Sequence, residues 1–513
     1  MGCKEERQCA AAAHAGRNRR SVRTVCGEGE AEFFSLSPFD KAKYSSLLKG
    51  LEASEVQLSD VLSADQSFRI DSEYFKKDDI KRLQRIEELS HASLKTLTHK
   101  IDVGYVGAMT TEYTDDTAAP KLLQTRNIDE FIPNDTDLVH INLHFHDELK
   151  KSQIRTNDIL IARSGSFGNA AIWLDKETVN SSDIIIIEAD SAQVEPCYLV
   201  AFLNSRYGRF QLERYASGAV QEHVNLTILE NLKIALLSDR VQNRISSAVH
   251  DAYNMLMQSR KVYCDAESTL LKELGFANWR PTDGGVSTKS LSGTIAVGRI
   301  DAEYFQPKFY EIEARIRTRA TGVLCAADAL ITGLCKSDDD KVEQYIELAD
   351  IGASGTVESC TKAEFADLPS RARQRVSKGQ VIVSSIEGSL KSCALITSDF
   401  DGALCSTGFH RFQTDKINPE TLLLLFKSWP IQELLKRGCS GTILSGISAD
   451  SLEDIPLPIL PQRVQSFLAD KVRESFRLRN ESKMLLDLAK FAVELAIEKG
   501  DDTALSYMMH KGT

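Results

Sequence analysis

The sequence predicts an α+β fold that is built twice, with a long amphipathic helix after each of the two units. The first observation is a seven-residue phrase, RIDSEYF at 69–75, that returns as RIDAEYF at 299–305. Two shorter matches follow in the same order: Leu229–Ile234 with Leu452–Leu457, and Arg240–Gln242 with Arg463–Gln465. The second observation is a stripe of apolar residues at helical spacing after each unit. Chance recurrence does not explain three ordered matches, so we infer an internal repeat.

Length and composition limit the class of protein. A chain of 513 residues is too long for one core and predicts about three domains. It is 42% hydrophobic and 26% charged, and no run of 18 apolar residues is present, which excludes a membrane-spanning helix. The 11 cysteines form no CxxC pair and indicate reduced thiols in a cytosolic protein. A net charge of −11 argues against nonspecific binding of polyanions by the chain alone.

Residues 1–43 differ from the rest of the chain. They are rich in Ala, Arg and Gly, and they lack both hydrophobic periodicity and the apolar core of a secretory signal. We expect a disordered leader or a start codon placed too early.

The first unit, residues 44–238, is expected to mix helices and strands. The expected elements are a short helix and strand in 44–65, a charged helix in 76–94, strands and turns in 103–128, two buried strands around a glycine turn in 158–173, a buried strand at 184–187 and a helix at 198–207. Alternation of apolar residues with Gly and Thr indicates the strands.

The second unit, residues 299–460, follows a linker at 277–298 and repeats this order. Tyr345–Ile351 corresponds to Leu122–Ile128, and Val381–Gly388 corresponds to Ile159–Gly165. The stretch 422–436 corresponds to the helix at Tyr198, and we expect Pro430 to break or kink it.

A long helix is predicted after each unit, at 239–276 and 461–500, with a tail at 501–513. Their apolar stripes, which step mostly by three or four, need a partner surface along their whole length. Gly275 and Gly500 are well placed to end the helices. The two helices bury their stripes best against each other, antiparallel, although each could instead fold back on its own unit. The predicted interface residues are Val241, Ile245, Val249, Leu256, Val464, Leu468, Val472 and Phe476.

This order of motifs resembles the DNA-specificity (S) subunit of type I restriction-modification systems, over roughly residues 44–499. The similar motifs are Arg69–Phe75, Asp158–Trp173, the glycine turn with Gln-x-His-x-Asn at Ser217–Asn225, the strand at Leu232–Leu237, and its second copy at Ile455–Pro458. The family has two target-recognition domains, held apart by two long helices that pair as a coiled coil. The resemblance therefore implies two similar α+β target-recognition domains with an internal pseudo-twofold repeat.

The resemblance also implies a function without catalysis on this chain. The chain would read an asymmetric bipartite site in double-stranded DNA and dock modification methyltransferase subunits, two of them because of the pseudo-twofold. S-adenosylmethionine would bind to the partner methyltransferase, no cofactor would bind to this chain, and an ATP-dependent restriction subunit could join. We expect a cytoplasmic location in a bacterium or archaeon.

Candidate DNA-binding residues lie after the expected strands and in the glycine turns. Polar side chains there can read the donor and acceptor pattern of the major groove. In the first unit they are Gln124, Arg126, Asn127, Arg163, Ser164, Ser166, Asn169, Gln221, His223 and Asn225. In the second unit they are Ser384, Ser385, Lys391, Ser440, Thr442 and Ser445. A structural role is the alternative for Arg163, which can bond to its turn, and for His223 and Asn225, which can stabilise theirs.

Two features oppose this assignment. Residues 66–238 hold 19 Lys and Arg against 26 Asp and Glu, although phosphate contacts usually dominate affinity for DNA. The second glycine turn, at 441–448, lacks the Gln, His and Asn of the family. A scaffold that reads no DNA, or a decayed specificity subunit, is therefore the alternative function.

The sequence gives little sign of an enzyme. It has no phosphate-binding GxxxxGK[ST] loop, and GSFG at 165–168 is only a weak GxxG. His140, His144 and His146 would share one face of a strand and could hold a metal, which makes a metal-dependent hydrolase the less favoured alternative.

Overall fold

The structure is a computed structural model that describes residues 40–51, 54–64, 71–134, 137–163, 168–216, 226–282, 287–335, 341–441 and 445–511. Most of the predicted leader lies outside these residues. The chain divides into two compact units, residues 1–77 and 78–513. In the first, α2 (Lys41–Leu48) and α3 (Leu58–Ala64) are both helices, and no strand occurs among the described residues of 44–65. The strand expected there is therefore wrong.

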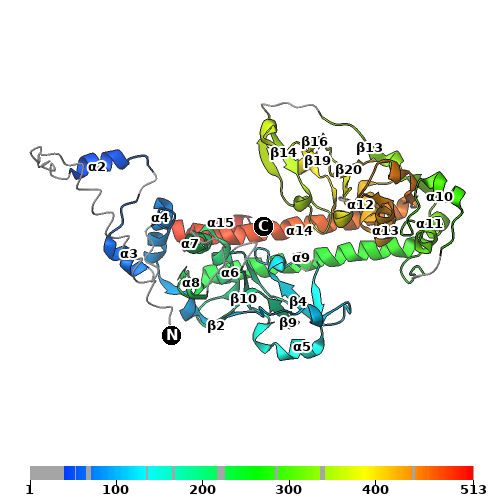
Figure 1. The fold of residues 1–513 in the computed structure, drawn as a ribbon. Coiled ribbons are helices and arrows are strands. Elements are labelled where there is room, and N and C mark those ends of the chain that lie inside the picture. Colours follow the sequence, from blue (N-terminus) through cyan, green and yellow to red (C-terminus); the bar gives the residue numbers. More distant parts are fainter. Residues whose placement is uncertain are drawn as a thin grey trace, which may run out of the picture. The chain divides into compact units, whose positions relative to one another are not determined.

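The first α+β domain contains two main sheets beside its helices (Figure 1). One has the order β2-β10-β7-β8: Thr98–Val103, Ile184–Ala189, Ile159–Ala162 and Ala170–Ile172. The other has the order β3-β5-β4-β9-β6: Tyr113–Thr114, Val139–Ile141, Lys121–Gln124, Val179–Ser182 and Gln153–Ile154. A short ladder joins β1 (His91–Ser93) to β11 (Lys233–Ala235). The helices are α4 (Lys77–Glu87), α5 (Leu143–Glu148), α6 (Pro196–Asn204), α7 (Arg206–Ala216) and α8 (Leu226–Glu230).

The second α+β domain has corresponding sheets. One has the order β13-β20-β17-β18: Leu330–Ile331, Phe409–Phe412, Val381–Ser384 and Cys393–Leu395. The other has the order β15-β14-β19-β16: Thr361–Glu364, Val342–Ile346, Leu404–Ser406 and Ala372–Arg375. Short ladders join β12 (Gly322–Cys325) to β23 (Pro456–Ile459) and β21 (Cys439–Ser440) to β22 (Gly446–Ile447). The helices are α10 (Leu291–Val297), α11 (Pro307–Arg319), α12 (Pro419–Lys427) and α13 (Trp429–Gly438).

The two domains share the strand order of the first sheet, and their second sheets correspond except for the additional edge strand β3 in the first domain. In each domain one pair in the second sheet is parallel, β4 with β9 and β14 with β19, among antiparallel neighbours. The predicted break at Pro430 is present, because α12 ends at Lys427 and Pro430 lies in the first turn of α13. The α+β fold predicted from the sequence is confirmed.

Two long helices, α9 (Asp239–Glu273) and α14 (Gln462–Lys499), pack along each other (Figure 1). The hydroxyl of buried Ser259 donates to the Ser475 carbonyl at 2.8 Å, and the hydroxyl of buried Ser482 donates to the Ala252 carbonyl at 2.7 Å. A step of seven residues back along α9 is thus a step of seven forward along α14, so the helices are antiparallel. The segment predicted as a tail contains α15 (Asp501–Lys511), which buries Ala504, Leu505 and Met508.

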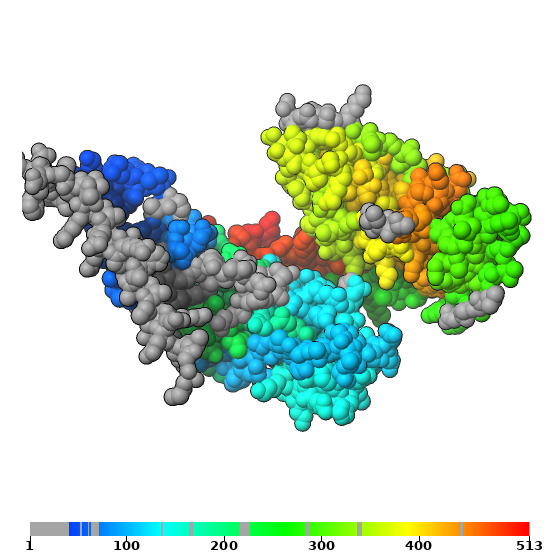
Figure 2. Space-filling model, in the orientation of Figure 1, coloured from blue at the N-terminus to red at the C-terminus, as the bar shows by residue number. Residues whose placement is uncertain are grey.

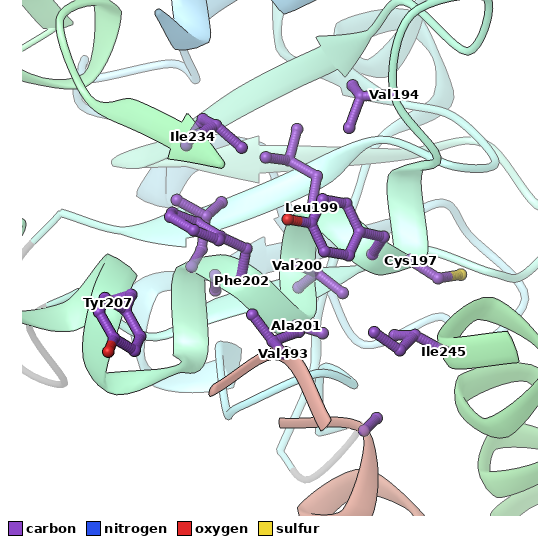
Figure 3. Packing of buried hydrophobic residues seen from close by; sticks show 14 of the residues in the cluster. Val194, Cys197, Leu199, Val200, Ala201, Phe202, Tyr207, Ile234, Ile245 and Val493 are labelled. Carbon is purple, nitrogen blue, oxygen red and sulfur yellow. The ribbon is translucent and has the colours of Figure 1, made fainter. Parts of the chain in front are cut away.

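The first domain packs on this helix pair chiefly through α6, whose nine residues are all buried (Figure 3). Val200 and Ala201 lie near Ile245 of α9 and Val493 of α14. Burial of an Ile or Leu side chain contributes about 1.5–3 kcal/mol, so this contact contributes much of the free energy that holds the first domain on the helix pair. In the second domain α12 packs on both long helices in the same way.

The predicted interface stripes are therefore shared between the partner helix and the domains. Val241, Ile245, Val249, Leu468 and Val472 are buried, while Leu256, Val464 and Phe476 are partly buried. Pairing of the two helices and packing of each helix on its own domain, which the sequence offers as alternatives, occur together. Each long helix needs apolar residues on more than one face for this reason.

Matched polar contacts fix each domain to the long helix that follows it. The Gln242 side chain accepts from the backbone N–H of Glu195 at 3.0 Å and donates to the Leu237 carbonyl at 2.8 Å. Gln465 accepts from the backbone N–H of Asn418 and donates to the Leu460 carbonyl, both at 2.9 Å. Both glutamines are buried, and each satisfies backbone groups that would otherwise lack partners.

The end of each long helix is held by an arginine from the opposite domain. Arg315 of α11 donates to the Gly275 carbonyl at 2.6 Å, just beyond the C-terminus of α9. Arg85 of α4 donates to the carbonyls of Ile497 and Glu498 at 2.9 and 3.1 Å, in the last turn of α14. A cation at a helix C-terminus pairs with carbonyls that lack partners and with the negative end of the helix dipole.

Candidate nucleic-acid interface

The loop after β4 holds Gln124, Arg126 and Asn127, in a single turn of 3-10 helix, η3 (Thr125–Asn127). Asn127 is buried, and its side-chain oxygen accepts from the Gln124 backbone N–H at 3.0 Å. We therefore reassign Asn127 as a brace of the loop, because a buried carboxamide cannot reach a base edge. Gln124 is partly buried and donates to the Tyr113 hydroxyl at 3.3 Å, whereas Arg126 is exposed. DNA contact by these last two stays a prediction.

Arg163 follows β7 and lies beside the same loop. Its guanidinium is 2.8 Å from the Asp183 carboxylate, and the Thr125 hydroxyl donates to the Asp183 carbonyl at 3.0 Å. The structure thus brings Arg163 and η3 together through Asp183. The pair is about one-third exposed, so a phosphate or a base edge would have to compete with this carboxylate.

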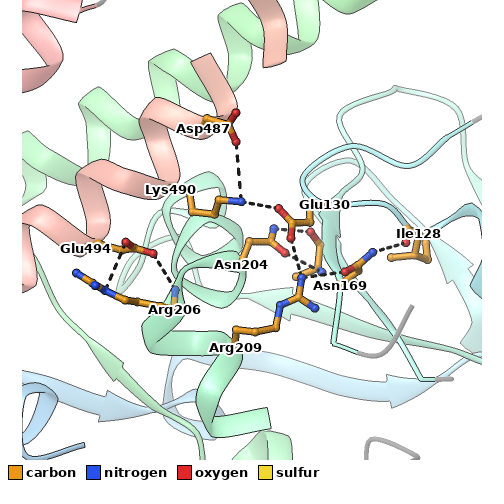
Figure 4. A network of polar contacts seen from close by, with 10 residues as sticks. Ile128, Glu130, Asn169, Asn204, Arg206, Arg209, Asp487, Lys490 and Glu494 are labelled. Atoms are coloured by element: carbon orange, nitrogen blue, oxygen red, sulfur yellow. Dashed lines mark hydrogen bonds and ion pairs between the residues drawn. The ribbon is translucent and has the colours of Figure 1, made fainter. Parts of the chain in front are cut away.

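Asn169 takes part in hydrogen bonds within the protein. Its amide donates to the Ile128 carbonyl at 3.3 Å, and its oxygen accepts from Arg209 at 2.9 Å (Figure 4). Arg209 and Lys490 both bind the carboxylate of Glu130, at 2.7 and 2.8 Å. Asn169 therefore belongs to a polar network where the first domain, through Glu130 and Arg209 of α7, meets Lys490 of α14, and its contact with DNA stays a prediction.

Five predicted contacts lie outside the described residues: Ser164, Ser166, Gln221, His223 and Asn225 in the first domain. Thr442 in the second domain lies outside them as well. Their DNA contacts stay predictions.

The second domain brings its predicted residues together where the loop after β17 meets the β21–β22 hairpin. The Ile447 N–H donates to the Ser385 carbonyl at 2.8 Å, and the Glu387 N–H donates to the Ser445 carbonyl at 3.0 Å. Ser384 is buried and bonds to Ser389, so we reassign it as a brace. The remaining candidates are Ser385, Lys391, Ser440 and Ser445, of which Lys391 and Ser440 are exposed.

The second copy of the repeated heptapeptide, Arg299–Phe305, is a structural clamp. Arg299 holds Asp301 at 2.8 Å and donates to the Cys439 carbonyl at 2.9 Å, just beyond the C-terminus of α13. The Tyr304 hydroxyl donates to Asp454 at 3.0 Å, and the guanidinium of Arg437 stacks on the Tyr304 ring. Asp71 and Asp301 accept from the backbone N–H three residues later at 3.0 Å in both copies. The hydrogen bond to the Asp side chain is thus the same in both copies, so we infer that the heptapeptide recurs because the fold requires it.

The histidine cluster does not form a metal site. His140 lies on β5 and bonds to the Ala119 carbonyl, whereas His144 and His146 lie on α5, which was expected to continue as a strand. His146 bonds to Asn180, and His144 points to Glu148 at 3.6 Å. No group of three His, Cys, Asp or Glu residues that could hold a metal ion occurs among the described residues. The prediction that the three histidines share one face of a strand, which suggested a metal-dependent hydrolase, is thus wrong.

The pKa shifts in the two domains follow from burial. Burial raises the pKa of Asp158, before β7, to about 6, although its carboxylate accepts from the Arg155 N–H at 2.7 Å. Burial also raises the pKa of the Cys393 and Cys405 thiols to about 12, so neither supplies a thiolate near neutral pH. It lowers the pKa of His410, whose Nε2 lies 2.9 Å from the Ile447 carbonyl and so carries the proton. That bond supports the β21–β22 hairpin.

Among the described residues, no helix is long and apolar enough to cross a membrane. The groups at both candidate surfaces are hydrogen-bond donors and acceptors on short loops, held by β-sheets and braced from beneath. Such a set can present amide, hydroxyl and guanidinium groups to a ligand.

Comparison with known proteins defines the class. Residues 99–262 match the family described as the type I restriction modification DNA specificity domain. This segment contains both main sheets of the first domain, α6 to α8 and most of α9. The first domain is thus similar to the DNA-specificity domains of this family. The predicted resemblance to the S subunit of type I restriction-modification systems is confirmed over these residues.

Solved structures with similarity to the chain include the S subunit of a type I restriction-modification system from M. genitalium. It is 13% identical, with 82% of this chain and 95% of that chain covered and a TM-score of 0.34. The HsdS subunit from Thermoanaerobacter tengcongensis is 14% identical, with 80% and 97% covered and a TM-score of 0.24. No curated protein matches the chain.

Proposed function

We propose that the chain is the DNA-recognition subunit of a restriction-modification complex and that it reads an asymmetric bipartite site. The observation that supports this most is the DNA-specificity domain at residues 99–262, followed by a second domain with the same strand order. Two readers multiply specificity, because each mismatched base pair costs about 1–3 kcal/mol. Their candidate residues differ, so the two half-sites would differ too.

The helix pair α9 and α14 would act as a coiled-coil spacer between the readers. The first domain packs near the N-terminal half of α9, around Val241 and Ile245, and the second near Leu468 and Val472 of α14. Because the helices are antiparallel, these contacts lie toward opposite ends of the pair. The reciprocal end contacts of Arg85 and Arg315 support a pseudo-twofold relation between the halves.

Catalysis would lie on partner chains. We propose that methyltransferase subunits, two of them by the pseudo-twofold, bring S-adenosylmethionine and dock on the helix pair, and that a restriction subunit can join. Part of α14 is visible at the surface in Figure 2. Its exposed apolar side chains include Phe467, Met484 and Phe491, which are 45%, 54% and 42% exposed. Apolar groups on an otherwise charged helix favour a protein contact there.

The test is co-expression with a type I methyltransferase subunit that assembles with the chain, followed by sequencing of methylated genomic DNA. We expect methylated adenine within a motif of two parts. Exchange of residues 66–238 for those of another specificity subunit should change one part and leave the other. An assembled complex that leaves the DNA unmodified would contradict the proposal.

A scaffold that docks the methyltransferase without reading DNA is the second candidate. The turn at 441–448, which lacks the Gln, His and Asn of its counterpart in the first domain, favours it for that half of the chain. In that case the exchange of residues 66–238 would alter the entire methylated motif, because the second domain would contribute nothing to it.

A further inference from the structure

The loop after β14 in the second domain has the same construction as the loop after β4 in the first. A single turn of 3-10 helix, η6 (Leu348–Asp350), follows β14 as η3 follows β4. The Glu347 N–H donates to the Asp350 carboxylate at 2.7 Å, and the Gln124 N–H donates to the Asn127 side chain at 3.0 Å. In each loop the side chain of the first of these residues accepts in return from the backbone N–H of the second. Glu347 therefore occupies the place of Gln124, a candidate DNA-binding residue.

An arginine that is not among the predicted DNA-binding residues is fixed to this second loop. Arg371 donates from Nε to the Tyr345 hydroxyl and from Nη2 to the Glu347 carboxylate, both at 3.1 Å. Tyr345 is buried in a small core with Phe365 and Leu404, so its hydroxyl has a fixed position. Arg371 is thus held at two points, although its side chain is 58% exposed.

The first domain has an arginine and a carboxylate at the corresponding place. Asp183, the residue directly after β9, pairs with Arg163 beside η3. β19 pairs with β14 in parallel, as β9 pairs with β4. Thr407 directly follows β19, and its N–H donates to the Arg371 carbonyl at 2.9 Å. Arg371 therefore lies where the first domain has its ion pair, although Ser385 follows β17 where Arg163 follows β7.

The two hydrogen bonds of Arg371 leave one edge of its guanidinium open. A guanidinium has five N–H donors in one plane, and Tyr345 and Glu347 occupy the edge formed by Nε and Nη2. Within the described residues, Nη1 has no hydrogen-bond partner. Nη1 and the second proton of Nη2 form a pair of donors that matches the O6 and N7 acceptors of guanine in the major groove. An arginine that the protein already holds loses less conformational freedom when it binds.

We propose, on the basis of the proposed function, that Arg371 is a specificity-determining residue of the second domain and contacts a guanine in its half-site. Tyr345 and Glu347 position it. An arginine beside a carboxylate then serves both domains but comes from different strands, which suits readers of unlike half-sites. The competing role is structural, in which Arg371 only fastens the segment before β16 to the loop after β14.

The test uses the assembled methyltransferase complex and sequencing of methylated genomic DNA. Arg371→Ala should relax one G·C pair in the half of the motif that does not change when residues 66–238 are exchanged. Relaxation adds methylated sites, so a loss of folding cannot produce it. In binding assays the wild-type complex should prefer a duplex with this G·C pair over one with A·T by roughly 5- to 150-fold, and Arg371→Ala should lose this preference.

Two further variants separate a reading role from a structural one. Glu347→Gln removes the carboxylate but keeps a side-chain acceptor, as Gln124 does in the first domain. It should weaken the preference for the same G·C pair, but less than Arg371→Ala does. Arg373→Ala is the matched control, because it removes an equal charge two residues away, from a guanidinium that stacks on the Phe365 ring. This control should keep the wild-type motif.

The outcomes distinguish the proposal from the function on which it rests. A wild-type motif in Arg371→Ala, an equal relaxation in Arg373→Ala, or a second half-site without a G·C pair would overturn the proposal. If Arg371→Ala does not assemble, Glu347→Gln decides: relaxation of one G·C pair supports the proposal, and a wild-type motif overturns it. A wild-type complex that assembles and leaves the DNA unmodified would instead contradict the proposed function.

Discussion

The two domains meet the helix pair through the same backbone arrangement but through different charges. In the first, the Glu130 carboxylate accepts from Arg209 of α7 and Lys490 of α14 (Figure 4). Asn204 at the end of α6 completes the junction with two hydrogen bonds to the backbone of Ala170.

The second junction has other residues at these places. An offset of 223 residues, which relates Gln242 to Gln465, relates Glu130 to Ala353, Arg209 to Gln432 and Asn204 to Lys427. Lys427 donates to the Lys391 carbonyl at 3.4 Å, and Gln432 donates to the carbonyls of Leu390 and Phe426. The repeat thus preserves the helix positions and the backbone groups that need partners, while the charges that surround them have changed.

The largest expected effect concerns what the two junctions share, Gln242 and Gln465. Gln465→Leu removes partners from the Asn418 N–H and from the Leu460 and Lys416 carbonyls. Each buried group left without a partner costs about 1–3 kcal/mol, so we expect a loss of roughly 3–5 kcal/mol in the free energy of unfolding. Urea denaturation monitored by circular dichroism would measure it. Gln242→Leu should cost nearly as much, and a loss below 1 kcal/mol in either variant would contradict the shared brace.

The second prediction concerns the charge of Glu130, which the first junction has and the second lacks. Glu130→Gln should lower the free energy of unfolding by about 1–2 kcal/mol, because Arg209 and Lys490 lose their common carboxylate in a partly buried site. The loss should shrink as salt is raised. Ala353→Gln at the corresponding place is the control and should change little. An equal effect of both substitutions would show that the charge at Glu130 is unimportant.

The third prediction concerns the cation of the second junction. Burial lowers the pKa of Lys427 from its usual value of 10.5, although the nearby Glu267 opposes this shift. The unfolded chain then binds the proton more tightly than the folded chain does, so stability rises as pH increases toward 10.5. Lys427→Met should stabilise by roughly 1 kcal/mol at pH 7 and should lack this rise. Thermal unfolding between pH 7 and 10 would show whether the two proteins converge.

Repeat order and helical periodicity were sufficient to predict the α+β class and the positions of α9 and α14, because both depend on where apolar residues recur. Helices α3 and α5 were missed, since segments of six or seven residues carry too little periodicity. The candidate site was harder to predict. Asn127, Asn169 and Ser384 are polar residues in loops, as DNA readers are, but they satisfy buried backbone groups. Burial distinguishes the two roles for Asn127 and Ser384, and for the partly buried Asn169 the hydrogen bond from Arg209, 40 residues away in the sequence, does so. Neither can be read from the local sequence.

The smallest expected effect concerns the turns that precede β7 in the first domain and β17 in the second. The Asp158 carboxylate accepts from the N–H of Arg155 at 2.7 Å, and in the second domain the Gln380 side chain accepts from the N–H of Ser377 at 3.1 Å. The turns are therefore closed in the same way, once by an acid and once by a neutral amide. Burial raises the pKa of Asp158 to about 6 from its usual 3.8.

Between these two pH values the folded chain keeps a proton that the unfolded chain has lost, so the free energy of unfolding should fall as pH rises from about 4 to 6. We expect a fall of up to about 2 kcal/mol once solvent screening is allowed for. Asp158→Gln copies the second domain and should remove this dependence while it keeps the turn. Denaturation at pH 4, 5, 6 and 7 would measure the difference. An unchanged pH profile would mean that Asp158 titrates as an exposed acid and that the two turns differ only in sequence.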